Sequence, residues 1–373
     1  MKIGIITLPL HHNIGGLLQA WALQNTLTKL GHDVEIIDQK PIVGSWLKEI
    51  VRFCIQAARK IVGSKKTILF PYIIKMQYTN KFTHRKIHFR GSRNFDQIKQ
   101  NDYDTFVVGS DQIWRPDYAG KSLYSAYLDF AKDWNNIKRI AYATSFGVEE
   151  WKYTEEQTNK CSELAKRFDL ITVREDSGVT LCRENLKIEA KHVVDPTMLM
   201  TIEDYSYLID EDANTYAGSE LFCYVLDETP EIKHLIAYVE KDGNFSKTQV
   251  IEGTFKWKNI FKKNVCQYPT VTQWLRCFRD AKCIITDSFH GTVFSIIFNK
   301  PFVVLHNEGR GNARMESLVR SFDIEERLVN ANEKDQVLKL LRTQLNTEDK
   351  LLRLREFGLE TLKKINKRTT QTL

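Results

Sequence analysis

Short apolar runs that alternate with longer stretches of helical periodicity are the feature that most constrains the fold of this chain. In the first half, six such runs have the pattern of strands, and Gly, Asp or Ser follows many of them. The intervals between them are long enough for crossover helices, which predicts a parallel sheet with helices on both faces. The six predicted strands are 2–7, 33–38, 105–110, 139–144, 170–175 and 192–195.

A second series of apolar runs follows residues 196–220, a polar stretch without strand signals. A chain of 373 residues also exceeds what one average core holds, so two domains are expected. We therefore predict a GT-B-like α/β fold, in which two doubly wound Rossmann-type domains face a ligand-binding cleft. The second series comprises 221–226, 248–253, 283–288 and 301–306. The predicted units are an N-terminal domain (1–205), a C-terminal domain (206–345) and a C-terminal helical tail (346–373).

Composition excludes several classes of protein. Hydrophobic residues make up 42% of the chain and charged residues 27%, which is typical of a soluble globular protein and argues against wholesale disorder. No run approaches the ~18–20 apolar residues of a membrane span. The apolar run at the N-terminus is too short for a signal peptide, and the seven cysteines are scattered without a C-x-x-C pair. We therefore expect a cytoplasmic protein.

Positive charge is concentrated in residues 41–95. This segment holds twelve Lys and Arg residues and one acid, so its net charge is +11. The whole chain has a net charge of +7, so the remaining residues together carry −4. Apolar side chains are interleaved with these charges. The mixture predicts a basic helical insertion that contacts an anionic membrane surface, or else a solvated helical hairpin with one buried face. No nucleic-acid-binding motif accompanies the charge, so a nucleic-acid partner is not expected.

Polar loops follow several of the predicted strands, where ligands of parallel sheets bind. After the first strand, glycines precede a helix and leave backbone amides suited to an anion, with a histidine beside them. After strand 105–110, polar side chains suited to sugar hydroxyls are followed by a tryptophan that either stacks on a sugar or caps the core. The candidates in these two loops are His11, His12, Asn13, Gly15, Gly16, Ser110, Asp111, Gln112 and Trp114.

A second set of loops indicates an anion site. Arg174 ends a strand, where its guanidinium can fork onto a carboxylate or phosphate or pair with its own neighbours. The run T-D-S-F-H-G-T places His290 at the start of an apolar helix, where it can act as an acid–base or phosphate-binding group. The candidates here are Arg174, Asp287, Ser288, Phe289, His290, Gly291, Arg310 and Arg314. With Asp111 and Asp287 as the acids, this set is suited to a small polyanion.

Taken in order, these motifs resemble the polysaccharide pyruvyl transferase family. The family usually has Asn-Tyr-Gly in its first loop, where this chain has Asn13-Ile14-Gly15. The resemblance covers about residues 3–328. The motifs that carry it are N-I-G-G-L-L-Q-A-W-A-L-Q, G-S-D-Q-I-W, Y-A-T-S-F-G, V-R-E-D-S, V-V-D-P-T, T-D-S-F-H-G-T-V-F-S and N-A-R-M-E-S-L.

The resemblance implies transfer of a pyruvyl group from phosphoenolpyruvate to two hydroxyls of a hexose, such as galactose or an N-acetylhexosamine, often linked to a lipid carrier. It implies that the donor binds through Arg174 and through Phe289, His290 and Gly291. A further basic residue downstream is expected to contact the donor, and Arg310 and Arg314 are both candidates for it. We expect no metal and no cofactor beyond the donor substrate. The membrane-facing acceptor would explain the basic segment 41–95.

The catalytic roles are hypotheses at this point. His290 is the expected acid or phosphate-assisting donor, and Asp111 or Asp287 the base that accepts a hydroxyl proton. The loop residues His12, Asn13, Gly15, Gly16, Ser110, Gln112, Trp114 and Ser288 are expected to bind the acceptor or shape the loops around it. Two other functions stay open: a GT-B glycosyltransferase that uses a nucleotide sugar, and a non-catalytic protein that binds a saccharide or an anion.

Overall fold

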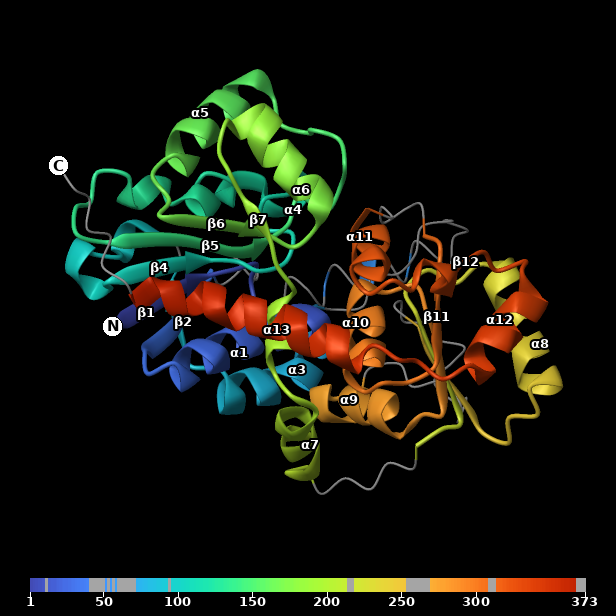
Figure 1. Ribbon diagram of the computed structural model, residues 1–373. Coiled ribbons are helices and arrows are strands. Elements are labelled where there is room, and N and C mark those ends of the chain that lie inside the picture. The colour runs from blue at the N-terminus through green and yellow to red at the C-terminus, as the bar shows by residue number, and fades with distance from the viewer. Residues whose placement is uncertain are drawn as a thin grey trace.

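Two parallel β-sheets, each covered by helices, make up the protein, whose structure is a computed structural model (Figure 1). The structure describes residues 1–10, 13–39, 51, 54–55, 58, 72–92, 95–212, 218–252, 269–307 and 313–366. The predicted GT-B-like α/β fold is confirmed, including a helix at the C-terminal end of the chain. The predicted limits after residues 205 and 345 stay predictions.

The first sheet has seven parallel strands in the order β3-β2-β1-β4-β5-β6-β7. The order reverses between β1 and β4, and Ile6 lies opposite Val108, so the loops after these two strands leave the same edge together. This reversal is the switch point at which open α/β sheets bind ligands. The strands are β1 (Lys2–Ile6), β2 (Asp33–Gln39), β3 (Phe89–Ser92), β4 (Thr105–Val108), β5 (Lys138–Thr144), β6 (Leu170–Val173) and β7 (Lys191–His192).

The second sheet has five parallel strands in the order β12-β11-β10-β8-β9, with its switch point between β8 and β10. Its central strands are apolar and buried on both faces, as expected where helices cover both sides. The strands are β8 (Leu221–Val225), β9 (Thr248–Glu252), β10 (Cys283–Thr286), β11 (Phe302–Leu305) and β12 (Leu328–Val329).

Helices connect the strands, and several begin at a side-chain cap. Asn13 caps α1, Ser288 caps α10, and threonines cap α5, α7 and α9. The helices are α1 (Ile14–Lys29), α3 (Tyr72–Lys86), α4 (Pro116–Ala119), α5 (Glu155–Ala165), α6 (Asp176–Leu181), α7 (Ile202–Asp210), α8 (Pro230–Asp242), α9 (Val271–Asp280), α10 (Phe289–Ile297), α11 (Ala313–Ser321), α12 (Lys334–Arg342) and α13 (Glu348–Lys363).

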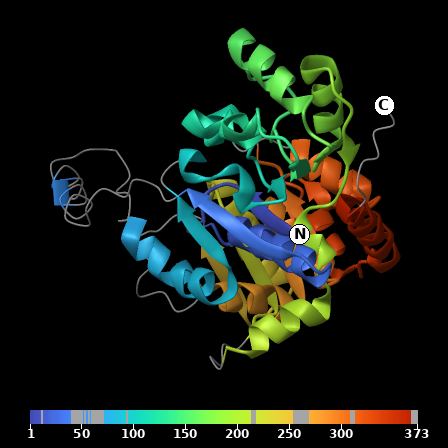
Figure 2. The ribbon, with the colours of Figure 1, turned by 90° about the vertical axis from the view of Figure 1, so that its left-hand side faces the viewer.

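All ten predicted strands appear at or near their expected positions, and two further strands were not predicted. β12 has only two residues, and β3 has the sequence FRGS, which lacks an apolar run. β3 corrects the prediction for residues 41–95, because the end of this segment is an edge strand paired with β2. Helix α3 precedes it and lies at one side of the molecule (Figure 2). Most of residues 41–71 lie outside the described residues.

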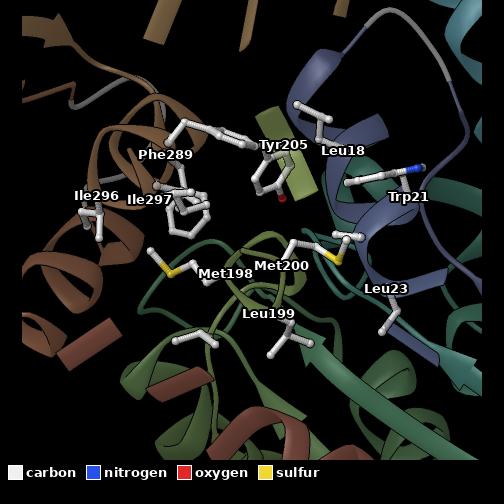
Figure 3. Close-up of a cluster of buried hydrophobic side chains, with 14 of the residues drawn as sticks. Leu18, Trp21, Leu23, Met198, Leu199, Met200, Tyr205, Phe289, Ile296 and Ile297 are labelled. Atoms are coloured by element: carbon white, nitrogen blue, oxygen red, sulfur yellow. The ribbon is translucent and has the colours of Figure 1, made fainter. Parts of the chain in front are cut away.

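One hydrophobic core joins the two sheets. Met198 and Leu199, in the 3₁₀ segment Pro196–Leu199, and Met200 pack between α1 and α10 (Figure 3). Tyr205 of α7 joins the same cluster, with its ring 5.0 Å from that of Phe294. Because this core contains side chains from both halves of the chain, it holds the ends of the two sheets close to each other.

The C-terminal helix returns to the first sheet. Helix α13 (Glu348–Lys363) runs back from the second sheet to the first (Figure 1). Arg355 donates to the carbonyl of Met198, and the ammonium of Lys138 donates to the carbonyl of Ile365. In the part of the chain that the structure describes, no helix combines the length and the apolar character needed to cross a membrane.

Candidate functional site

The end of β4 begins the site with a backbone that requires glycine. Gly109 has φ +127°, and a Cβ there would lie 2.1 Å from the carbonyl oxygen of Tyr142, so no other residue fits. This sharp backbone turn at the end of β4 directs Ser110 and Asp111 toward the switch point of the first sheet. Both side chains are buried, and Asp111 is bridged to Thr144 of the neighbouring strand.

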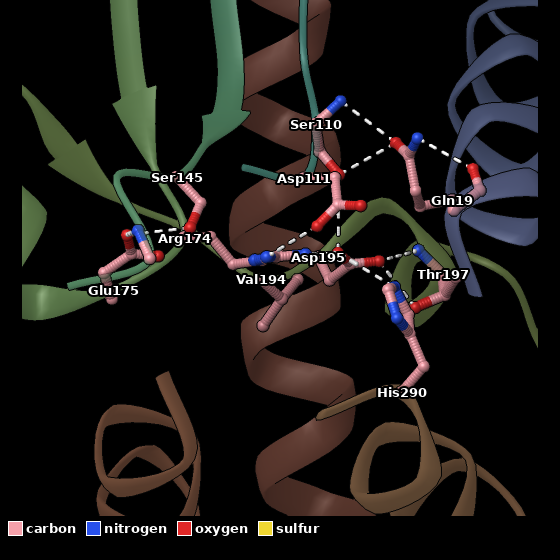
Figure 4. A network of polar contacts seen from close by, with 12 residues as sticks. Gln19, Ser110, Asp111, Ser145, Arg174, Glu175, Val194, Asp195, Thr197 and His290 are labelled. Atoms are coloured by element: carbon pink, nitrogen blue, oxygen red, sulfur yellow. Dashed lines mark hydrogen bonds and ion pairs between the residues drawn. The ribbon is translucent and has the colours of Figure 1, made fainter. Parts of the chain in front are cut away.

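Arg174, which follows β6, is held between two carboxylates. Its Nη2 lies 3.1 Å from Oδ1 of Asp111, and its Nη1 lies 2.8 Å from Oδ2 of Asp195 (Figure 4). Its side chain is 1% exposed, and both carboxylates are nearly as deeply buried. A buried cation without such partners would be strongly destabilising, so the three residues form one unit. Arg174 is therefore an interior ion pair in this structure rather than an open cation.

Hydrogen bonds from three other segments fix this unit. Gln19 of α1 accepts from the hydroxyl of Ser110 at 2.9 Å and donates to the hydroxyl of Thr7 at 3.0 Å. Oδ1 of Asp195 accepts from the backbone amide and the hydroxyl of Thr197, at 3.0 and 2.7 Å. Buried networks of this kind are rigid when their members are satisfied.

His290 reaches this network from the other sheet. It lies in the first turn of α10, after β10, and its Nε2 is 3.9 Å from Oδ2 of Asp195. Its ring lies against Gly15 of α1, where a Cβ would be only 2.2 Å from Nδ1. Gly15 is therefore needed for the close approach of the two halves. The N-termini of α1 and α10, which both attract anions, meet at this histidine.

Phe289 connects two arginines to the same place. The guanidinium of Arg174 lies 4.2 Å from the centre of the Phe289 ring, and that of Arg314 lies 5.8 Å from it. Both are within the range of cation–π attraction. Arg314 lies in the first turn of α11, so it adds a second cation from the second sheet.

The charges in the site shift each other's pKa. Burial alone would raise the pKa of Asp111, but Arg174, His290 and Arg314 outweigh it and hold the pKa below its usual value. Burial lowers the pKa of His290, although Asp195 and Asp111 act in the opposite direction. Burial, and then the charge of Arg174, lower the pKa of Arg314 to about 10. At neutral pH Asp111 and the two guanidiniums are therefore charged, and the imidazole of His290 is mostly neutral.

Asp287 corrects one expectation, because it is bound elsewhere. Its carboxylate accepts from the amides of Leu226 and Asp227, at 2.6 and 3.0 Å, and from the side chain of Asn307 at 3.0 Å. These bonds tie together the ends of β8, β10 and β11. Because both of its oxygens accept these hydrogen bonds, Asp287 is not placed to act as the base. Asp111 remains the candidate base.

Of the two roles predicted for Trp114, the structure shows the second, because the side chain belongs to the core. Its ring is completely buried, stacks 4.7 Å from that of Tyr127, and donates its Nε1–H to the carbonyl of Ala126. It therefore cannot stack on a sugar. The exposed aromatic ring of this region is Tyr118 on α4, which is 50% exposed and has the guanidinium of Arg115 4.7 Å from its centre.

The remaining predicted residues shape the loops or lie outside the described structure. Asn13 accepts from the amide of Gly16, and Ser288 accepts from the amide of Gly291, so these two side chains are helix caps. Gln112 accepts from Arg115. The predicted residues His11, His12 and Arg310 lie outside the described residues.

Four polar residues of the site were missed. Asp195 and Thr197 come from the V-V-D-P-T motif, Gln19 lies in the middle of a helix, and Glu175 follows Arg174. Glu175 accepts from Ser145, Phe146 and Gly147 and so fixes the end of β5. Nothing in the sequence around these residues identifies their partners, which only the fold brings together.

The arrangement can bind a small anion and supply a proton donor beside it. Two helix N-termini and two arginines surround His290, and Asp111 is a nearby acceptor. Among the described residues, no group of three or more His, Cys, Asp or Glu side chains is arranged to hold a metal ion.

Structural similarity places the chain among GT-B proteins. UDP-GlcNAc 2-epimerase from Methanocaldococcus jannaschii matches with a TM-score of 0.54 and 12% identity over 97% of this chain and 99% of that one. The enzyme from Neisseria meningitidis, solved with bound UDP-GlcNAc, matches with a TM-score of 0.51 and the same identity and coverage. At this identity they show the fold alone. No curated protein matches the chain significantly.

Family membership is shown by the sequence. The family model described as polysaccharide pyruvyl transferase matches residues 13–309, which include Gly15, Asp111, Arg174, Asp195 and His290. This match covers most of the chain and confirms the resemblance seen in its motifs. Together with the fold and the anion-binding geometry, it shows that the chain belongs to the polysaccharide pyruvyl transferase family.

Proposed function

We propose that this protein transfers a pyruvyl group from phosphoenolpyruvate to two hydroxyls of a hexose, forming a cyclic ketal in capsule or exopolysaccharide biosynthesis. The observation that carries the proposal is the position of His290. It lies between Gly15 and Asp195 of the first half, where the N-termini of α1 and α10 meet beside Arg174 and Arg314. A proton donor inside an anion-binding site is what this reaction needs.

Phosphoenolpyruvate carries a phosphate and a carboxylate, so it needs two sets of positive groups. We place one anion at the N-terminus of α10 near Arg314, and the other toward the N-terminus of α1. Both terminal nitrogens of Arg174 are engaged by Asp195 and Asp111, so Arg174 contacts the donor only if one of these pairs opens. The assignment of Arg310 as a further contact stays a prediction.

The reaction then requires three proton transfers. His290 protonates C3 of the donor to a methyl group, and C2 becomes an oxocarbenium-like electrophile. The first sugar hydroxyl attacks C2 and gives its proton to Asp111, and the C2–O bond to phosphate then breaks with the electron pair leaving on phosphate. The second hydroxyl closes the ring, and its proton leaves with phosphate or solvent. The two hydroxyl protons balance the proton added to C3 and the one carried away.

The acceptor is proposed to be galactose or an N-acetylhexosamine on a lipid carrier, at the inner face of the membrane. The support for this is the charge of +11 in residues 41–95, because each Lys or Arg near an anionic surface adds about 1 kcal/mol of attraction. Sedimentation with vesicles containing anionic lipid tests the contact. A Lys/Arg→Gln variant of residues 48–66 should bind more weakly, and equal binding would rule this contact out.

The second sheet gives no support to a nucleotide-sugar donor. Its switch point lies between β8 and β10, where such a fold would hold a diphosphate. There the amides of Leu226 and Asp227 already bind the carboxylate of Asp287, which adds negative charge at that position.

Phosphate release tests the proposal directly. Purified protein is incubated with phosphoenolpyruvate, with and without a panel of β-galactosides and N-acetylhexosaminides, and inorganic phosphate is measured. Acceptor-dependent release that disappears in His290→Gln is the expected result. Release that persists in His290→Gln, or no release and no thermal shift with phosphoenolpyruvate, would contradict the proposal.

A further inference from the structure

His290 and Asp195 come from opposite halves of the chain and almost touch. Nε2 of His290 has no hydrogen-bond partner among the described residues, although the side chain is only 9% exposed. The nearest carboxylate oxygen to it is Oδ2 of Asp195, at 3.9 Å. A buried ring nitrogen without a partner is costly, so its surroundings are expected to offer one in some state of the protein. A shift of about 1 Å would bring this pair to hydrogen-bond distance.

Asp195 is the fixed member of the pair. Its Oδ1 accepts twice from Thr197, and its Oδ2 accepts from Arg174 at 2.8 Å and from Ser110 at 3.4 Å. The side chain is fully buried, so its direction is set by these four bonds (Figure 4). His290 is carried by α10 of the other half, so a small shift between the halves would change its distance from Asp195.

The groups that face His290 are balanced in charge. Asp195 and Asp111 favour the imidazolium, while Arg174 and Arg314 oppose it. Gly15 and the ring of Phe289 also lie against the imidazole, and neither adds charge. A bound anion tips this balance toward the protonated ring, and catalytic hydrogen bonds that are long in a free enzyme commonly tighten once the substrate is bound.

We propose that Asp195 is a positioning residue for His290. When the donor binds, the Nε2–H of His290 donates to Oδ2 of Asp195, across the junction of the two halves. This bond fixes the plane of the ring and holds it as an imidazolium, and the other ring nitrogen carries the proton that goes to the donor. The inference deepens the proposed function and rests on it for the identity of the donor.

The test follows the protonation of His290 itself. The ¹⁵N-histidine spectrum of the full chain is recorded against pH, without ligand and with phosphoenolpyruvate, and His290→Gln assigns the signal. In Asp195→Asn, which keeps an oxygen for Thr197 but loses the charge, the midpoint of His290 should fall by about one pH unit or more in both series. Asp111→Asn, which removes an equal charge without facing Nε2, should lower it less. Equal midpoints in the wild type and a folded Asp195→Asn would overturn the proposal.

Enzyme kinetics and a crystal structure of the complex with phosphoenolpyruvate provide two further tests. The alkaline limb of kcat/KM for phosphoenolpyruvate, which reports loss of the proton from His290, should move to lower pH in Asp195→Asn. A merely structural role would lower the rate and leave the limb in place. If Asp195→Asn does not fold, a crystal structure of the wild type with phosphoenolpyruvate decides: a distance from Nε2 to Oδ2 below about 3.2 Å supports the pair, and one that remains at 3.9 Å excludes it.

These outcomes separate the two proposals. If no acceptor supports phosphate release but the midpoint of the ligand-free protein falls in Asp195→Asn, the proposed reaction fails and the pair stands. If release depends on the acceptor and the midpoints are equal, the reaction stands and the pair fails.

Discussion

At the scale of single residues, Arg174 shows how this site combines charge with rigidity. Its guanidinium is closed in by Asp111, Asp195 and the ring of Phe289, so it acts on a ligand through its field more than through an open contact. Such a buried triad is held together by its own partners, and removing one of them leaves the others uncompensated.

Stability should respond strongly to loss of this guanidinium. Arg174→Ala leaves two buried carboxylates unpaired, and we expect it to lower the free energy of unfolding by about 3–5 kcal/mol in urea denaturation. The matched control is Arg320→Ala, because Arg320 forms an exposed ion pair with Asp176 and should cost about 1 kcal/mol or less. Similar losses in the two variants would show that Arg174 is not the structural centre of the site.

Binding of phosphoenolpyruvate should take up a proton at His290. The pKa of His290 lies below 6.5 in the free protein, chiefly through burial, so the ring is neutral at pH 7.5. An anion raises this pKa, which means that binding weakens as the pH rises. Calorimetry in buffers of different ionisation enthalpy should show proton uptake in the wild type and less in His290→Gln. The same uptake in both proteins would place the proton elsewhere.

Sequence reasoning found those site residues that directly follow an apolar run. Asp111, Arg174 and His290 were identified because the end of a parallel strand is where ligands bind. Asp195 also ends such a run, but its partners Arg174 and Ser110 lie far away in the sequence, and only the fold brings them together. The sequence could not decide between the two roles of Trp114, because periodicity cannot distinguish a core aromatic from one that faces a cleft.

At the scale of elements, the short helix α4 presents an exposed aromatic ring, whereas the ring of Trp114 is buried. Tyr118 is half exposed on α4, and Arg115, which covers one side of its ring, is itself bound to Gln112 at 2.9 Å. Because α4 follows the loop that carries Asp111, its exposed ring lies at the same end of the first sheet as the site. A four-residue helix such as α4 has no periodic signal, so the sequence could not show this.

The Tyr118 ring should contribute to binding of the acceptor, if the protein acts as proposed. Tyr118→Ala should raise KM for the sugar about tenfold or less, the range of an aromatic contact worth ~0.5–1.5 kcal/mol, while KM for phosphoenolpyruvate stays unchanged. Tyr118→Phe should retain most of the affinity. Tyr207→Ala on α7, which removes an even more exposed tyrosine, is the control. An unchanged KM for every acceptor in Tyr118→Ala would exclude this contact.

At the scale of the whole molecule, the geometry of the site depends on how closely the two halves approach. Two features hold them: the core around Met198, and α13, whose Gly358 leaves room for Leu199 and Tyr142. The sequence predicted two facing domains, but the contact between them depends on side-chain volumes that no pattern reveals. Gly15 is the clearest case, because its missing side chain is the space that the ring of His290 occupies.

A methyl group at Gly15 should therefore lower the activity of the protein much more than its stability. In Gly15→Ala the new Cβ would lie 2.2 Å from Nδ1 and 2.4 Å from Cγ of His290, so the ring or the second half must move. A displacement of about 1 Å at a catalytic group can cost 100-fold in rate, so we expect a loss of that order in phosphate release. Gly16→Ala is the control, because its nearest neighbour is Asn13 at 3.4 Å and both changes alter helix propensity alike. Equal rates in the two variants, with melting temperatures within a few degrees of the wild type, would show that the contact between Gly15 and His290 does not set the active geometry.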